Sequence, residues 1–134
     1  MIKSLIFSLL LSVSSAVFAN SNVELELDGT QRLDSWTSNR AMLLEGVASD
    51  NKTYRVRLSC ITKENNRAQG FAVGEIHVYK GTSHIGSKAT FDFEQCTSLV
   101  EKMKNYAARL SLKWDLAGYN AMSTGKVTFE VTEL

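Results

Sequence analysis

Two histidines and one glutamate are the residues whose types and spacing come nearest to a chemical site. His77 and His84 lie on either side of Lys80-Gly81, which we expect to be a two-residue turn between two strands. With that turn, the two imidazoles are opposite neighbours and Glu75 lies two residues along the same strand. Imidazole and carboxylate groups so placed can bind Zn²⁺ or Cu²⁺, with Glu75 as a third ligand.

A simpler alternative is that this strand face is solvated and binds no metal. Ligand-like spacing often occurs by chance, and two neutral histidines on an exposed hairpin need no further role. We therefore expect no cofactor, with Zn²⁺ or Cu²⁺ only under the metal-binding alternative.

Catalytic motifs are missing from the sequence. It has no Gly-x-Ser-x-Gly elbow, no glycine-rich phosphate loop and no dinucleotide fingerprint, and its acids alternate outward along predicted strands. We predict no catalytic residues and a protein that is not an enzyme, with a small hydrolase of unknown type as the second alternative.

Three large side chains occur in predicted loops. Trp36 lies in the Ser- and Thr-rich segment 30–40, and Tyr119 and Met122 lie in the glycine-bounded segment 117–125. Exposed Trp and Tyr side chains give a large contact area, so we predict these three as partner-binding residues. The alternative is that they fold back over the open end of a sheet.

The only two cysteines, Cys60 and Cys96, allow one disulfide. Residues 1–19 have an early Lys3, an apolar run and a final Val-Phe-Ala, the pattern of a secretory signal peptide cleaved near Ala19. Export to an oxidising compartment, periplasmic or extracellular, favours the disulfide. The apolar run is too short to span a membrane.

Composition limits the class of partner. The chain has 15 basic and 14 acidic residues; removing the leader removes Lys3 and no acid, which leaves 14 of each. A nucleic-acid partner is therefore not expected, because such binding depends on basic excess. Residues 20–134 have the length of a single domain.

Alternating apolar residues predict strands over 23–27, 41–48, 53–63, 71–79, 82–92, 110–116 and 127–132. The segments 41–48 and 53–63 should form a hairpin around Asp50-Asn51-Lys52, with Glu45 opposite Arg57 and Cys60 facing the core. Trp114 should also face the core. Apolar residues at spacings of three and four from Cys96 to Leu110 predict one amphipathic helix over about 93–110.

These elements predict an α+β fold. About seven strands form a mainly antiparallel sheet or a partly closed barrel, one helix packs on it, and a C-terminal hairpin follows. This order over residues 41–134 resembles the OB-type receptor-binding subunits of bacterial pentameric toxins, which are small, exported and glycan-binding. A cystatin-like fold has similar elements. Neither resemblance includes a motif, so neither implies a residue role.

We therefore expect a small exported binding protein that recognises a protein or a glycan through loops and edge strands. The edge strands could also support a homo-oligomer. A metal-binding module using His77 and His84 is the leading alternative.

Overall fold

The structure is a computed structural model that describes residues 22–36, 40–62, 72–115 and 127–134. The predicted signal peptide lies outside these residues. Within them, the elements are β1 (Asn22–Asp28), η1 (Gly29–Gln31), η2 (Asp34–Trp36), β2 (Ala41–Val47), β3 (Thr53–Ile61), β4 (Val73–Lys80), β5 (Ser83–Asp92), α2 (Phe93–Lys104), β6 (Ala108–Asp115) and β7 (Thr128–Glu133). This is the predicted α+β architecture.

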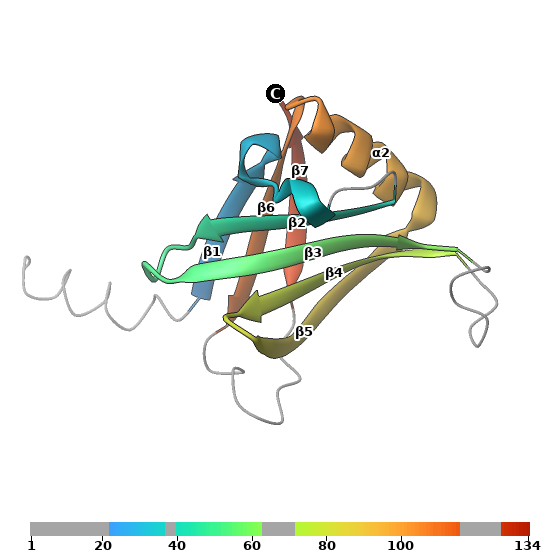
Figure 1. Cartoon of the computed structure of the whole chain (residues 1–134). Helices are drawn as coiled ribbons and strands as arrows, with labels where there is room; N and C mark the ends of the chain where they lie inside the picture. Colours follow the sequence, from blue (N-terminus) through green and yellow to red (C-terminus); the bar gives the residue numbers. More distant parts are fainter. Residues whose placement is uncertain (1–21, 37–39, 63–71, 116–126) are drawn as a thin grey trace, which may run out of the picture.

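The strands form two antiparallel sheets, ordered β1-β6-β7 and β2-β3-β4-β5, whose strands run across one another (Figure 1). On one side the sheets are joined, because β1 lies against β2 and the Ser49 N–H donates to the Glu24 carbonyl at 2.8 Å. On the other side β5 and β7 are connected by a ring contact between Phe91 and Phe129, centroids 4.8 Å apart, rather than by a strand ladder. The two sheets thus make a partly closed barrel.

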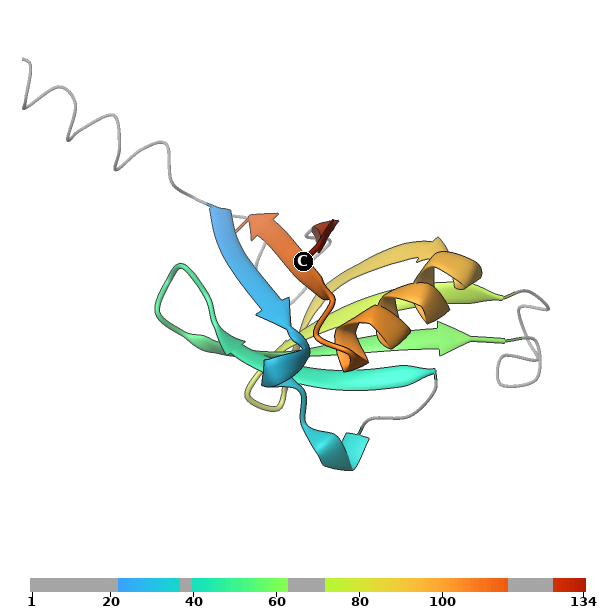
Figure 2. The same ribbon diagram turned by 90° about the horizontal axis from the view of Figure 1, so that it is seen from above.

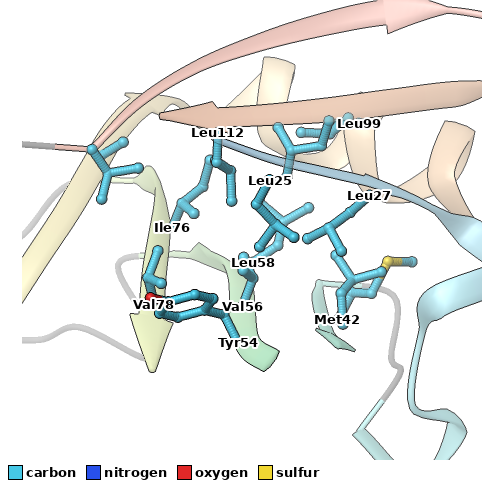
Figure 3. Close-up of a cluster of buried hydrophobic side chains, with 14 of the residues drawn as sticks. Leu25, Leu27, Met42, Tyr54, Val56, Leu58, Ile76, Val78, Leu99 and Leu112 are labelled. Carbon is cyan, nitrogen blue, oxygen red and sulfur yellow. The ribbon is translucent and has the colours of Figure 1, made fainter. Parts of the chain in front are cut away.

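The core lies between the two sheets and consists largely of the alternate apolar residues that the sequence predicts. Figure 3 shows side chains from several strands and from α2 pointing toward one another. The predicted inward residues of β3, from Tyr54 to Cys60, are buried. Trp114 is 2% exposed and its ring meets that of Tyr54 edge-on at 4.9 Å, which confirms its predicted core position.

The helix α2 covers one end of the four-stranded sheet (Figure 2). Asp92 begins it by accepting a hydrogen bond from the Glu94 N–H at 2.7 Å. Its buried stripe consists of Cys96, Leu99, Val100 and Met103. No helix among the described residues combines the length and apolarity needed to cross a membrane.

The helix ends six residues earlier than predicted. Tyr106 has a left-handed backbone with φ of +58°, which stops the helix after Lys104, and β6 begins at Ala108. Ala107 and Leu110 fit the helical spacing, but Leu110 also fits a strand alternation that runs from Ala108 to Trp114. The strand prevails because β6 pairs on both edges, with β1 and with β7.

The hairpin of β2 and β3 forms as predicted, but its pairing is displaced by two residues. Glu45 lies opposite Arg55, not Arg57, and its Oε2 is 2.9 Å from the Arg55 Nε. The Ala48 N–H donates to the Lys52 carbonyl at 3.0 Å, so the turn spans residues 49–51, one residue earlier than predicted, and Asn51 has φ of +63°. A displacement by two leaves every side chain on its predicted face.

The predicted disulfide between Cys60 and Cys96 is present and joins β3 to the first turn of α2. Gly74 of β4 lies opposite Cys60 and directly beneath the bridge. A Cβ at Gly74 would lie 2.6 Å from the Cys96 Cβ and 2.9 Å from the Phe91 ring. Helix and sheet therefore approach more closely here than a larger residue would allow.

Loss of this bridge should destabilise the fold substantially. The bonded cysteines are 36 residues apart, and cross-linking a loop of that size lowers the entropy of the unfolded chain by the equivalent of about 4 kcal/mol. We expect the double variant Cys60→Ala, Cys96→Ala to lose a free energy of unfolding of that order, measured by urea denaturation. Reductant should destabilise the native protein and leave the variant unchanged; equal stabilities of native protein and variant would contradict the role given to the bridge.

Candidate functional site

The predicted histidine site lies on the outer face of the four-stranded sheet, turned away from the core. Strand alternation places five polar side chains there, because the residues that flank them in β3 and β4, and Ile85 and Ala89 in β5, are buried. They are Arg57 of β3, Glu75 and His77 of β4, and His84 and Lys88 of β5.

The strand pairing at this site differs from the prediction. The turn is Gly81-Thr82, where Gly81 has φ of +62°, so Lys80 pairs with Ser83 instead of lying in the turn. An irregularity between His77 and Tyr79 displaces the pairing further, and His77 lies opposite Lys88. The predicted face-to-face pairing of the histidines is therefore wrong.

The two imidazoles nevertheless meet. Nδ1 of His77 lies 3.2 Å from Nε2 of His84, and the ring centroids are 5.3 Å apart. The irregularity in β4–β5 pairing brings the rings together diagonally. The His77 side chain is only 15% exposed, whereas His84 is exposed, so only one of the two is open to solvent as predicted.

Glu75 lies at the other end of the His77 ring. Its Oε1 is 3.7 Å from His77 Nε2, while its Oε2 accepts a hydrogen bond from Lys88 Nζ at 2.7 Å. Burial opposes ionisation of Glu75, but the hydrogen bond and charge of Lys88, with smaller contributions from His77, together outweigh it and lower the pKa of the carboxyl group. The carboxylate therefore stays charged beside His77.

Burial is the largest cause that lowers the pKa of His77 below its usual 6.5. The positive charge of Arg57, its partner across β3 and β4, acts in the same direction, as does His84. Glu75 acts in the opposite direction without overcoming them. His77 is therefore neutral at pH 7, with one ring nitrogen able to accept a hydrogen bond or a metal.

The three predicted ligands do not converge on one point. Glu75 faces Nε2 of His77, and His84 faces Nδ1, so the carboxylate and the second imidazole lie at opposite ends of the His77 ring. Among the described residues, no group of three His, Cys, Asp or Glu side chains is placed to hold a metal ion.

A second candidate site, which the sequence did not predict, is a groove of about 440 Å³ between α2 and β7. Ser98 and Lys102 lie along its helical side. Leu99, Phe91 and Phe129 supply its apolar surface, together with Val131. Lys102 forms an ion pair with Glu133 that links helix and strand beside the groove, and this contact lowers the pKa of Glu133.

The strand β7 contributes its core-facing side chains to this groove. Phe129 and Val131 pair with Leu112 and Leu110 of β6, which are at most 2% exposed and face the core. Val131 faces the same way but is 40% exposed, because no strand ladder joins β7 to β5. The apolar alternation of residues 127–131 predicted the strand but not this exposure.

The backbone of β7 also faces the groove side. The Leu134 N–H donates to the Ala107 carbonyl at 2.8 Å. Leu134 and Ala107 therefore continue the antiparallel ladder between β7 and β6 as a hydrogen-bonded pair. Because such pairs alternate along a ladder, the backbone groups of Phe129, Val131 and Glu133 point away from β6. Sheet order gives β7 no second partner strand in the described ranges.

The predicted partner-binding residues are not tested by this geometry. Tyr119 and Met122 lie outside the described residues. Trp36 closes the short helix η2, but its side chain also lies outside the description.

Comparison of the sequence with protein-family models and with curated proteins, and of the structure with solved structures, found no match. The topological resemblance to toxin subunits therefore has no match to support it.

The lowered pKa of His77 predicts a loss of stability in mild acid. As the pH falls, the unfolded chain takes up a proton at this residue before the folded chain does. The contribution of neutral His77 to the free energy of unfolding is therefore complete above pH 6.5 and is lost as the pH falls through the pKa of His77 in the folded chain. We expect the free energy of unfolding to decrease below pH 6.5, by at most about 1.4 kcal/mol per pH unit. In His77→Gln this slope should disappear, as urea denaturation at several pH values would measure.

The slope is to be read above about pH 5.5, because the lowered pKa values of Glu75, Asp28 and Glu133 cause their own loss of stability only as the pH approaches the ordinary 3.8 to 4.5 of the unfolded chain. The quantity compared is the slope of the free energy of unfolding against pH. The absolute free energy of unfolding is not compared, because the variant also changes it by losing contacts. Equal slopes for native protein and variant would show that His77 does not titrate as its surroundings indicate.

Proposed function

We propose that this chain is a small exported, non-enzymatic binding protein that recognises an extended segment of a protein partner. The observation that carries the proposal is found along β7. There, outward-pointing backbone groups and the partly exposed side chains of Phe129 and Val131 border the same apolar groove.

Strand addition explains why these features would occur together. An extended peptide beside β7 would receive backbone hydrogen bonds from Phe129, Val131 and Glu133. Every second side chain of that peptide would enter the groove against Phe91 and Leu99. Both kinds of contact need an extended polypeptide, so the groove favours a protein segment over a glycan.

Charges at the groove limit the composition of the segment. Glu94 lies at the rim, and Glu133 is paired with Lys102, which leaves one net negative charge among these three residues. A segment with alternate apolar residues and a neutral or basic remainder would therefore fit better than an acidic one.

A glycan partner, the other class expected from the sequence, would require a different surface. The candidate side chains for it are Trp36, Tyr119 and Met122, all outside the description. The proposal therefore rests on the groove. A glycan partner would be indicated if no peptide bound there.

Export is part of the proposal. Its support is the leader-like pattern of residues 1–19 and the disulfide, which persists in oxidising compartments. We expect the protein recovered outside the cytoplasm to begin near Asn20, with residues 1–19 removed. Intact-mass measurement of the exported fraction checks this, and recovery of the full-length chain from the cytoplasm alone would contradict it.

The groove can be tested with peptides selected from a displayed random library against the folded domain. We expect enriched sequences to alternate apolar residues and to bind in the groove. Val131→Lys places a charge there, and Val131→Pro removes an outward N–H; each should weaken binding at least tenfold, measured by fluorescence polarisation.

Val47→Lys is the matched control. Val47 is, like Val131, an exposed valine on an edge strand, with 64% of its surface exposed, but it lies on β2 and not beside the groove. It should leave peptide binding unchanged. Peptides that bind both Val131 variants as tightly as the native protein would overturn the proposal. Self-association that Val131→Lys abolishes, seen by light scattering, would instead identify a second copy as the occupant.

A further inference from the structure

We propose that His77 and His84 form a two-histidine chelate for a borderline divalent ion such as Zn²⁺, Ni²⁺ or Cu²⁺, with Glu75 as the outer partner of His77. This role for Glu75 differs from that of a third ligand. It rests on which nitrogen of His77 each neighbour faces, and it is independent of the groove beside β7.

The separation of the two nitrogens fits one metal ion. Zn–N bonds are about 2.0–2.1 Å, so two nitrogens bound to one tetrahedral zinc lie about 3.3 Å apart. His77 Nδ1 and His84 Nε2 are 3.2 Å apart. Chelation therefore needs the rings to turn their lone pairs toward a common point without changing their separation appreciably.

The surroundings of His77 favour one tautomer. Glu75 Oε1 faces Nε2, so the ring proton is stabilised there and the Nδ1 lone pair is directed toward His84. Metal-binding histidines commonly donate a hydrogen bond from the N–H of their second ring nitrogen to a carboxylate, and Glu75 Oε1 lies 3.7 Å from His77 Nε2, on the side where such a bond would form. Lys88 fixes that carboxylate through its 2.7 Å hydrogen bond.

The proton balance is simple. In the free protein, with Nδ1 of His77 as acceptor, His84 Nε2 donates the hydrogen bond between the rings. When the metal binds, that proton moves through solvent to Nδ1 of His84, and both facing nitrogens offer lone pairs. No proton is released, and water fills the remaining coordination positions.

Arg57 opposes the metal. It lies opposite His77 on β3, its guanidinium is 5.9 Å from the Tyr79 ring centroid, and its Nε is buried without a hydrogen-bond partner among the described residues. Its positive charge repels a divalent cation, so removing the charge should tighten binding. The site thus includes one residue whose loss should improve it.

Calorimetric titration of the folded, untagged domain with ZnCl₂ and NiCl₂ near pH 7.5 tests the proposal. We expect one ion per chain, at least tenfold weaker binding in His77→Ala and in His84→Ala, about tenfold weaker binding in Glu75→Gln, and tighter binding in Arg57→Gln. Glu45→Gln is the control, because Glu45 pairs with Arg55 on the same sheet, and it should change nothing.

Nitrogen-15 spectra of the histidine rings identify the ligand atoms. Zinc should shift the resonances of His77 Nδ1 and His84 Nε2 and leave His77 Nε2 protonated. Absence of binding up to millimolar metal, or binding unchanged in both histidine variants, would overturn the proposal and leave a hydrogen-bonded histidine pair only.

Discussion

The covalent bond between Cys60 and Cys96 and the glycine beneath it determine where the helix lies. Gly74 has no side chain to hold α2 away, so the first turn of the helix packs directly on β3 and β4. This position leaves the outward side of α2 next to β7, where Ser98 and Lys102 border the groove. A helix placed farther from the sheet would leave β7 without an opposing surface.

The alternation of inward and outward side chains along the strands made much of this fold predictable. The pairing of β2 with β3 is displaced by two residues, yet Met42, Leu44, Tyr54 and Val56 are buried as expected, because an even displacement keeps each residue on its face. Local backbone conformations were harder to predict. The left-handed Tyr106 ended the helix early, and the turn at Gly81 with the nearby irregularity displaced β4 against β5. Both depend on a few dihedral angles that apolar spacing does not encode.

Predictability differed between the two sites. The meeting of His77 and His84 followed from a hairpin with an approximately correct turn, although the assumed pairing was wrong. The position of Glu75 at the far nitrogen of His77 depends on rotamers and could not be predicted. The groove could not be predicted from the sequence, because Val131 fits the alternation of a buried strand. The exposure of Val131 arises because β5 and β7 are not joined by a strand ladder. Non-local packing of that kind leaves no local pattern.

The acids on β7 bear on aggregation. A strand with a bare edge can stack on copies of itself into fibrils, and apolar residues such as Val131 encourage this. Parallel in-register stacking, or an antiparallel alignment that matches Glu130 with itself, would bring like charges together, whereas the charge of Glu133 is compensated by Lys102. Glu130 therefore disfavours these alignments of identical strands, whereas a strand of different sequence without an acid at that position would not meet the same repulsion.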